Sequence, residues 1–343
     1  MARILLPLLL LLVLGNTNGA VMVGGWNDWQ YVFRPDMLPL PEKATVEHAH
    51  GIVIDGEGTI VITYKDALDD SQCLLRWDGD YKSTAKFIGP GRELCVGVPH
   101  GLRSSIEEGS MFLYHANNEQ SLHKTTMDGD IIWSVLGKPK DNMTEKFSPT
   151  WFAAIPAYDD GDNIISSDLL YLADGYGSNK IFIYNRSDGS VLNSHGGPGS
   201  ENGQFSTCHS ISWDSREGQM VVSDRENHRL EYFRVDPSDP SVFEYSHTRS
   251  FLPLLQRPCN LRIREEDGAA IVPTLEGAVG ILDSDNGLLS FINITDSLGD
   301  RGFLHPHDAH FVPGTEGDFV LVTWNPGRIG YFQRLTQDTE EVQ

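Results

Sequence analysis

The amino-acid sequence predicts an all-β fold, a six-bladed β-propeller. One observation is a motif that recurs at intervals of about 50 residues, which indicates a repeated supersecondary unit. A second is that short apolar segments separated by polar turns follow each copy of the motif, as expected for antiparallel strands. A third is the lack of long stretches with helical periodicity anywhere in the 343 residues.

Each repeat begins with a polar residue, usually His and usually after Pro, followed by a small residue and a short apolar strand. Successive starts are 50, 50, 59, 50 and 48 residues apart, and six starts predict six blades. The first residues of the repeats are His50, His100, Thr150, His209, Cys259 and His307.

Further strands follow the first strand within each predicted blade. Second strands are expected at residues 59–64, 111–115, 169–173, 219–223, 269–273 and 318–323. Third strands are expected at residues 73–77, 121–126, 180–184, 229–233, 279–282 and 329–334. Fourth strands are expected at residues 131–135, 191–194 and 288–292, each reached through a turn dipeptide such as Asp128-Gly129.

The sixth repeat reaches the end of the chain after three strands, so it lacks an outer strand. An open sheet edge is a liability, and a ring has to close. We therefore expect an N-terminal segment within residues 29–33 to supply the missing strand. The six blades then account for residues 20–343 as a single propeller domain.

Residues 1–19 have the pattern of a secretory signal peptide. Arg3 precedes an apolar run over residues 4–14, and small and polar residues lead to Gly19, after which cleavage is expected. The run is shorter than the roughly 20 residues of a membrane-spanning helix, and no later segment is long and apolar enough to cross a membrane. The sequence therefore predicts a secreted protein, either extracellular or in the lumen of secretory vesicles.

The composition fits an exported protein and excludes two classes of partner. Three Asn-x-Ser/Thr sequons, at Asn142, Asn185 and Asn293, are candidate glycosylation sites. The chain has 48 Asp and Glu against 26 Lys and Arg, a formal charge of −22. Nucleic acids and anionic membranes both attract basic surfaces, so neither is expected as a partner. Most carboxylates are expected to serve solubility.

The innermost strands of a propeller line its central channel, so the first residue of each repeat is expected to point at the axis. His100, His209 and His307 take this position in the second, fourth and sixth blades. Three neutral imidazoles at one level suit Zn²⁺ and leave a fourth position open, the pattern of a catalytic site. Three hydrogen-bonded channel histidines without a metal are the alternative. His50 is also in register but breaks the alternation, so it ranks below the other three.

Three further residues stand out by position. Asp308 follows His307 directly, and beside backbone carbonyls it is a candidate Ca²⁺ ligand or a residue that orients a ligand His. Tyr176 and Arg225 lie in unusually polar stretches at the same point of the third and fourth blades, just past the second strand. Loops there can reach the channel mouth. Blade packing for Tyr176 and a structural ion pair for Arg225 are the alternatives.

Five motifs also occur in the order and at the spacings that a known family shares. They are Pro99-His-Gly-Leu102, Ala173-Asp-Gly-Tyr-Gly-Ser-Asn-Lys180, Gly203-Gln-Phe-Ser-Thr-Cys-His-Ser210, Ser223-Asp-Arg-Glu-Asn227 and Pro306-His-Asp308. By these motifs, roughly residues 45–335 resemble the peptidyl-α-hydroxyglycine α-amidating lyases, which have propellers of the NHL-repeat type.

The resemblance implies a catalytic Zn²⁺ on the same three register histidines. It also implies a structural Ca²⁺ held by the carboxylate of Asp308 and the backbone carbonyls of Ile52 and Leu102. The family's catalytic Tyr falls on Tyr176, and a substrate-pocket Arg falls on Arg225.

This sequence departs from the family at a charged position of the first blade. The family's catalytic Arg falls on Lys65, which keeps the positive charge but lacks the planar fork of a guanidinium. Lys65 is nevertheless the candidate catalytic and substrate-binding cation. Arg76 and Arg103 could compensate if either reaches the channel.

The cysteines that are usual in the vertebrate enzymes of the family are absent from this chain, which has four Cys. Four are too few for a disulfide scaffold. This protein's own candidate pairs are Cys73 with Cys95, and Cys208 with Cys259. The second two are expected near the axis in adjacent blades, so free thiols close to the metal are the alternative.

The resemblance implies a carbon–nitrogen lyase, a peptidylamidoglycolate lyase, that splits C-terminal peptidyl-α-hydroxyglycine into a peptide amide and glyoxylate. Tyr176 would be the general base, Lys65 the cation that stabilises its phenolate, and Arg225 the partner of the substrate carboxylate. A separate upstream peptidylglycine monooxygenase would supply the substrate. Two alternatives are a catalytically degenerate metal-binding NHL propeller that acts as a binding module, and a Ca²⁺-dependent propeller lactonase.

Overall fold

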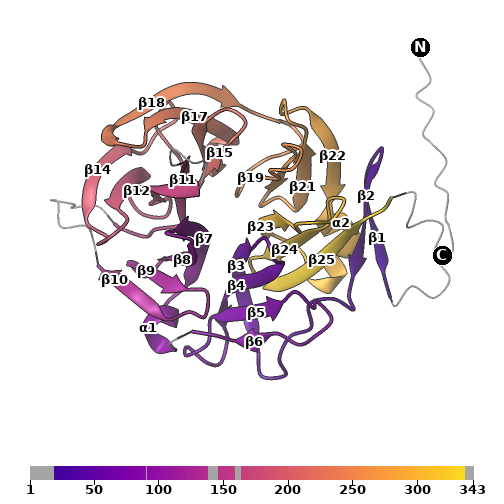
Figure 1. Cartoon of the computed structure of the whole chain (residues 1–343). Coiled ribbons are helices and arrows are strands. Elements are labelled where there is room, and N and C mark those ends of the chain that lie inside the picture. The colour runs from indigo at the N-terminus through magenta and orange to yellow at the C-terminus, as the bar shows by residue number, and fades with distance from the viewer. Residues whose placement is uncertain (1–18, 90, 138–145, 159–163, 337–343) are drawn as a thin grey trace, which may run out of the picture.

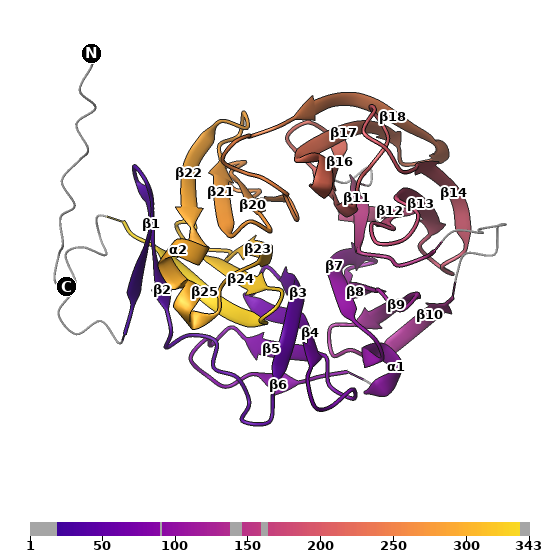
Figure 2. The ribbon, with the colours of Figure 1, turned by 180° about the vertical axis from the view of Figure 1, so that it is seen from behind.

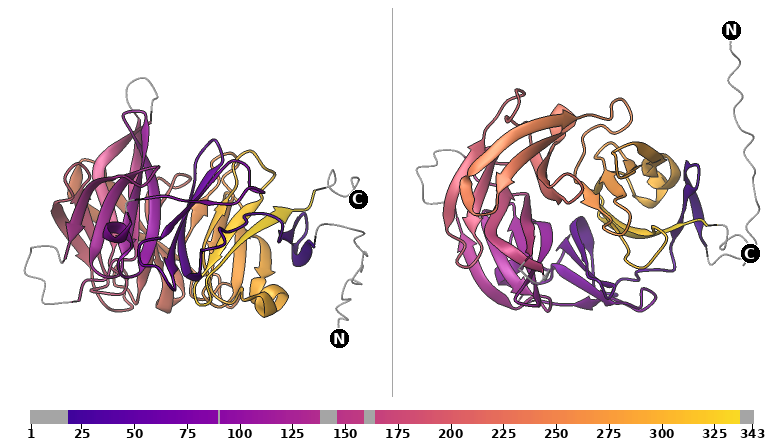
Figure 3. Two further views of the ribbon diagram at one scale, coloured as in Figure 1. Left: turned by 90° about the horizontal axis from the view of Figure 1, so that it is seen from below. Right: turned by 45° about the horizontal axis from the view of Figure 1, so that its top comes forward.

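The chain forms a ring of six antiparallel sheets around a central axis in the computed structural model (Figure 1). The structure describes residues 19–89, 91–137, 146–158 and 164–336. Seen from the side, the sheets stand next to one another as blades (Figure 3, left). The architecture confirms the predicted all-β, six-bladed β-propeller.

The first three blades each contain four strands that follow one another outward from the axis. Blade 1 contains β3 (Val46–Ile54), β4 (Thr59–Asp66), β5 (Leu74–Asp78) and β6 (Lys86–Phe87). Blade 2 contains β7 (Pro99–Glu107), β8 (Ser110–Asn117), β9 (Ser121–Thr126) and β10 (Ile131–Leu136). Blade 3 contains β11 (Trp151–Tyr158), β12 (Ile164–Ala173), β13 (Lys180–Asn185) and β14 (Val191–Gly196).

Blades 4 and 5 repeat this order, whereas blade 6 has five strands drawn from both ends of the chain. Blade 4 contains β15 (Cys208–Asp214), β16 (Gln219–Asp224), β17 (Arg229–Asp236) and β18 (Asp239–Arg249). Blade 5 contains β19 (Arg262–Ile263), β20 (Ala270–Pro273), β21 (Ala278–Leu282) and β22 (Leu288–Asn293). Blade 6 contains β23 (Pro306–Phe311), β24 (Phe319–Thr323), β25 (Arg328–Arg334), β2 (Trp29–Arg34) and β1 (Val21–Trp26).

Within the described residues, four short helical segments lie in the connections. They are the α-helices α1 (Arg92–Cys95) and α2 (Ile294–Leu298), and the 3₁₀ turns η1 (Arg225–Asn227) and η2 (Gly299–Arg301). None of the helices in the described part of the chain has the length and apolar character needed to cross a membrane.

An N-terminal strand closes the ring, as predicted. Strand β2 pairs antiparallel with β25, so that Phe33 faces Phe332 across the two strands. Figure 2 shows these first and last parts of the chain side by side in one sheet. Strand β1, which the sequence did not predict, continues the sheet beyond β2. Tyr31 and Phe33 are buried in the core of this blade, where the Tyr31 ring packs against Phe319 at 4.9 Å between centroids.

The hydrophobic core consists of layers between neighbouring blades. Between blades 2 and 3, Tyr114 of β8 packs against Phe152 of β11, with 6.0 Å between ring centroids. Between blades 6 and 1, Val320 of β24 belongs to the same cluster as Ile52 and Tyr64. The inner strands of each blade are therefore buried on both faces of the sheet. Burial of one large apolar side chain stabilises a fold by about 1.5–3 kcal/mol, so the layers fix the inner strands in place.

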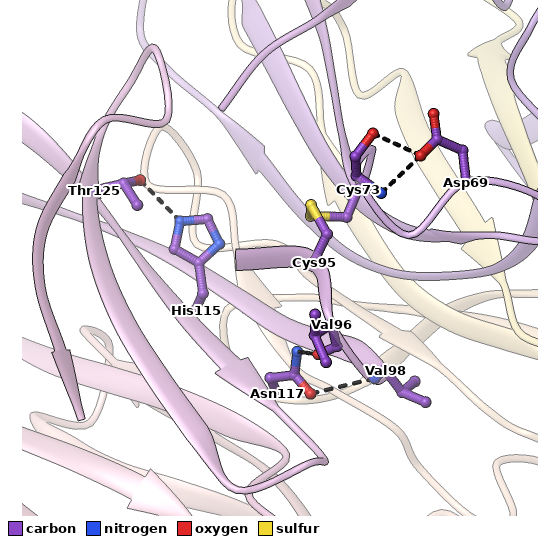
Figure 4. Close-up of a disulfide and its surroundings, with 9 residues drawn as sticks. Asp69, Cys73, Cys95, Val96, Val98, His115, Asn117 and Thr125 are labelled. Carbon is purple, nitrogen blue, oxygen red and sulfur yellow. Dashed lines mark hydrogen bonds between the residues drawn. A yellow bond between two sulfur atoms is a disulfide. The ribbon is translucent and has the colours of Figure 1, made fainter. Parts of the chain in front are cut away.

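A disulfide joins Cys73, just before β5, to Cys95 at the end of α1, which confirms one of the two candidate pairs (Figure 4). Next to it, Asn117 binds both sides of the following segment: its Nδ2 donates to the carbonyl of Val96, and its Oδ1 accepts from the amide of Val98. The start of β7 is therefore held by a covalent bond and by a buried side chain.

The other predicted pair does not form, because Cys208 and Cys259 are buried free thiols.

Two of the three predicted glycosylation sites lie within the described residues. Asn185 at the end of β13 and Asn293 before α2 are both partly exposed, and Asn142 lies outside the described residues, as does nearly all of the predicted signal peptide. Glycosylation and secretion stay predictions.

Candidate metal centre and cavity

Four histidines meet at the axis, each in an irregularity of an innermost strand. The pairing of β7 with β8 shifts register between Pro99 and Leu102, and His100 lies inside that shift. The other three register histidines lie in similar shifts of β3, β15 and β23. A β-bulge re-aims a side chain relative to a regular strand. The four side chains, all no more than 1% exposed, are those of His50, His100, His209 and His307.

The four imidazoles form one cluster. The ring centroids of His100 and His307 are 4.6 Å apart, and those of His209 and His307 are 4.5 Å apart. Nε2 of His209 lies 3.0 Å from Nε2 of His307. The ligating nitrogens of His50, His100 and His307 lie within 4.8 Å of one another, a spacing that one metal ion can bridge. The trio within 4.8 Å thus contains two of the predicted ligands, His100 and His307, together with His50. The third predicted ligand, His209, joins the cluster through its contact with His307.

Backbone carbonyls orient the three predicted ligands. Nδ1 of His100 lies 2.8 Å from the carbonyl oxygen of Thr150, and Nδ1 of His209 lies 2.7 Å from that of Cys259. Nδ1 of His307 lies 3.3 Å from the carbonyl oxygen of His50. A carbonyl only accepts, so Nδ1 carries the proton in each ring and Nε2 keeps its lone pair. This is the arrangement in which metal-ligating histidines are usually held.

The imidazoles of the cluster are uncharged, as metal-ligating histidines have to be. Burial lowers the pKa of His100 to about 3 and also holds the pKa of His209 and His307 well below the usual range, so the rings are neutral. Nε2 of His100 and Nδ1 of His50 are buried without a hydrogen-bond partner in the described part of the chain. Orphaned buried nitrogens among neutral imidazoles fit a divalent ion such as Zn²⁺.

His50 differs from the other three. Its ring stacks on that of His100 with centroids 4.6 Å apart and an interplanar angle of 29°. Its Nδ1 makes no well-aligned hydrogen bond within the described residues, and the nearest backbone group acting on the ring is that of Pro99. The alternation of blades placed His50 below the other three in rank, but the geometry brings it into the same cluster.

Tyr176 stands beside this cluster on the loop that follows β12. Its ring centroid lies 5.3 Å from that of His100 and 5.8 Å from that of His209. The buried carboxylate of Asp174 shapes the loop by accepting hydrogen bonds from the amides of Ser148 and Ser178 at 2.6 Å. Gly177 packs on that carboxylate so closely that a Cβ there would lie 2.3 Å from Oδ1 of Asp174. The sequence motif around Tyr176 is therefore a tight support for its side chain.

Arg225 is the cation that contacts Tyr176. Its Nη1 donates to the Tyr176 hydroxyl at 3.0 Å, and its guanidinium lies 5.4 Å from the centre of the Tyr176 ring. Burial raises the pKa of Tyr176, and the charge of Arg225 opposes that rise. Asp224 supports this loop as Asp174 supports the other, because it ends the second strand of its blade and accepts from the amide of Ser206 at 2.7 Å.

A cavity of about 450 Å³ opens over the cluster. Sequence reasoning identified Tyr176, Arg225 and two of the axial histidines that line it. It missed Arg257, whose Nη2 donates to Glu226 at 2.8 Å, the same carboxylate that binds Arg225. It also missed the side we call the apolar wall, since single apolar residues give no sequence signal. The apolar wall consists of Val98, Leu275 and Trp324, and the cavity is completed by His48, His50, Asn118 and His307.

The three candidate cations of the first two blades do not line this cavity in the described structure. Lys65 of β4 has its Nζ 3.5 Å from a carboxylate oxygen of Glu47 and pairs in register with His48 at the cavity edge. Arg76 forms ion pairs with acidic residues on the outside of the ring. Arg103 donates to Ser212 at 2.6 Å. The contact predicted for Lys65 with Tyr176 is made by Arg225.

The oxygens predicted to hold Ca²⁺ lie together but are already engaged. Nη2 of Arg262 donates to Oδ2 of Asp308 and to the carbonyl of Ile52, both at 2.6 Å, and lies 3.5 Å from the carbonyl of Leu102. A guanidinium therefore sits between the proposed ligands. In this arrangement the residues do not fit a calcium ion.

Comparisons with known proteins bear on the fold. No protein-family model matches the chain. Among solved structures, it is similar to a protein named as a gluconolactonase, with 12% identity, coverage of 87% of this chain and 94% of that chain, and a TM-score of 0.55. It is also similar to virginiamycin B lyase from Staphylococcus aureus, with 14% identity, 85% and 82% coverage, and a TM-score of 0.51. At such identities the similarity shows the fold alone.

Proposed function

We propose that this chain is a secreted, metal-dependent lyase that cleaves C-terminal peptidyl-α-hydroxyglycine into a peptide amide and glyoxylate. The observation that carries the proposal is the set of three axial histidines, each held at Nδ1 by a backbone carbonyl, beside the Tyr176–Arg225 pair. Three oriented Nε2 atoms offer a metal site with an open position, and the phenol offers a base next to it.

His100, His209 and His307 would hold the metal, for which Zn²⁺ is the best match to neutral imidazoles. When bound, Zn²⁺ supplies Lewis-acid polarisation of the substrate's α-hydroxyl group. The backbone carbonyls that hold the Nδ1 atoms keep the three rings aligned.

The walls of the cavity match the two ends of such a substrate. Arg225 and Arg257 both bind Glu226 and both line the cavity, so their guanidinium groups are the proposed partners of the carboxylate of the hydroxyglycine. The apolar wall would receive the side chain that precedes the hydroxyglycine. This placement leaves the α-hydroxyl group beside Tyr176.

Tyr176 is proposed as the general base. Its phenolate takes the proton of the α-hydroxyl group, and the carbonyl of glyoxylate forms as the C–N bond breaks. The electron pair of that bond goes to the amide nitrogen, which takes the proton back from Tyr176. Arg225 stabilises the phenolate through its hydrogen bond to the Tyr176 oxygen.

The test is glyoxylate release from a synthetic peptidyl-α-hydroxyglycine by Tyr176→Phe. Loss of the hydroxyl group should slow release by a factor of about 10²–10⁴ and leave the zinc content unchanged. Tyr184→Phe is the matched control, because the buried Tyr184 hydroxyl has no hydrogen-bond partner in the described structure and lies in β13, away from the cavity. Equal activity of the two variants would contradict the role of Tyr176, and no turnover by the unmodified protein would contradict the lyase.

A second function, a metal-binding propeller without lyase activity, is favoured by one observation. His50 adds a fourth imidazole to the cluster, and four His ligands would leave a tetrahedral ion no open position. Metal content and glyoxylate release of the unmodified protein and of His50→Ala separate the two. Zinc with turnover in both supports the lyase. Turnover that appears only in His50→Ala identifies His50 as the blocking ligand.

The Ca²⁺-dependent lactonase has less support, because none of the described residues lining the cavity is a carboxylate.

For the proposed lyase, the Cys73–Cys95 disulfide supports action in an oxidising compartment outside the cytoplasm. The substrate would be made by a separate upstream peptidylglycine monooxygenase, since hydroxylation of a peptidyl-glycine must precede this cleavage.

A further inference from the structure

Arg262 of β19 lies three residues past Cys259, the first residue of its repeat, and its side chain reaches across the axis of the ring. The residues it contacts there lie one or two residues past the first residues of their own repeats. The side chain of Arg262 is only 5% exposed. From blade 5 it contacts Ile52 of blade 1, Leu102 of blade 2 and Asp308 of blade 6 through hydrogen bonds. Its guanidinium also lies 5.7 Å from the centre of the Trp151 ring in blade 3. One side chain therefore ties together five of the six blades.

The carboxylate of Asp308 has no acceptor position left. Oδ2 accepts from the amide of Ile52 at 2.9 Å and from Nη2 of Arg262 at 2.6 Å. Oδ1 accepts from Nδ2 of Asn260 at 2.7 Å and lies 3.3 Å from Nε of Arg262. A carboxylate offers about four lone-pair directions, and all four are engaged.

The oxygens that a calcium ion would need as ligands already accept hydrogen bonds from Arg262. Ca²⁺ binds six to eight oxygens at about 2.3–2.6 Å, and the oxygens of Asp308 and Ile52 converge instead on one nitrogen. A dication placed among them would meet a buried guanidinium at about 3–4 Å, where like charges repel strongly in a poorly hydrated interior. A second guanidinium, that of Arg103, lies close enough to add to this repulsion. A calcium ion is therefore excluded both because its oxygen ligands are engaged and because the guanidinium groups repel it.

We propose that Arg262 replaces a divalent cation as the centre of the propeller axis, so that the fold holds its inner strands together without calcium. A chelator cannot remove a side chain, and the stability of this axis would not depend on the concentration of free calcium. This inference concerns the axial charge and does not depend on the lyase activity of the histidine cluster.

The test is thermal unfolding of metal-free protein with and without millimolar Ca²⁺, with Mg²⁺ as the ionic control. The Tm of the unmodified protein should change by less than about 1 °C, because Asp308 is already paired. Arg262→Ala leaves a buried carboxylate unpaired and should lower Tm by about 10 °C. Ca²⁺ but not Mg²⁺ should then raise the Tm of Arg262→Ala by at least about 5 °C, by filling the vacated place.

Arg264→Ala is the matched control, since Arg264 lies two residues further along and pairs with Asp267 away from the axis. Its Tm should not respond to Ca²⁺. The proposal is overturned if the unmodified protein binds one Ca²⁺ per chain or gains stability from it, a measurement that needs no variant. It is also overturned if Arg262→Ala folds equally well with and without Ca²⁺.

Discussion

At the scale of single residues, burial decides which charges the protein can keep. Glu231 of β17 is fully buried, and burial raises its pKa to about 7 from the usual 4.5 despite Arg229, whose Nη2 lies 3.3 Å away. Between these two values an unfolded chain loses the proton while the folded chain keeps it. The free energy of unfolding should therefore fall as pH rises through this interval and level off above it.

Glu231→Gln should remove this part of the pH dependence, because the amide has the same shape and no charge to bury. Relative to the unmodified protein, the variant should gain roughly 1–3 kcal/mol in unfolding free energy between pH 5 and pH 8. Urea unfolding at the two pH values measures the gain. Glu244→Gln, at an exposed ion pair with Arg234, should show none. Equal pH dependence of Glu231→Gln and the unmodified protein would contradict the prediction.

The residues of the candidate site differ in how far the sequence could predict them. The axial histidines were predictable because a repeat places equivalent residues at equivalent positions. Arg262 was not, since it lies outside the register and its partners come from other blades, more than 40 residues away in the sequence. The pairing of Tyr176 with Arg225 needed the loops that Asp174 and Asp224 hold, which spacing alone does not reveal.

At the scale of elements, the sequence predicts the inner strands better than the outer strands. The second and third strands of every blade overlap their predicted positions because most of their side chains are buried and most of the buried ones are apolar, although β9 buries His123 and Lys124. The outer strands β6 and β18 were missed. Strand β6 has only two residues, and β18 has no buried side chain along its length, so neither carries an apolar pattern. Sequence patterns report burial, and an outer strand is fixed by its backbone pairing instead.

The connection from blade 1 to blade 2 is the element that the disulfide stabilises. Cys73 and Cys95 are 22 residues apart, and closing a loop of that length stabilises a fold by about 3 kcal/mol through the unfolded chain. The double variant Cys73→Ser, Cys95→Ser should therefore lose about 2–4 kcal/mol in urea unfolding. Reductant should lower the stability of the unmodified protein equally and leave the variant unchanged. Full stability of the reduced protein would contradict the prediction.

At the scale of the whole molecule, the ring depends on the pairing of its two ends. Strand β2 supplies backbone hydrogen bonds to β25 and buries Tyr31 and Phe33 among the aromatic rings of blade 6. Two such side chains and their ring contacts contribute about 4–8 kcal/mol, a large fraction of the stability of a typical domain. Without β2, the edge of β25 would stand open beside the exposed side chains of its blade.

Removal of residues 1–35 should therefore do far more damage than removal of residues 1–19, although both leave the five other blades intact. The longer truncation should lower Tm by more than about 10 °C or abolish cooperative unfolding, because the sixth blade loses two of its five strands. Circular dichroism during heating measures this. A synthetic peptide of residues 20–36 added in trans should restore much of the lost Tm by pairing with β25. A truncated ring as stable as the longer protein would show that the blades close without the N-terminal strand, and that the layers between blades are sufficient to hold the axial site.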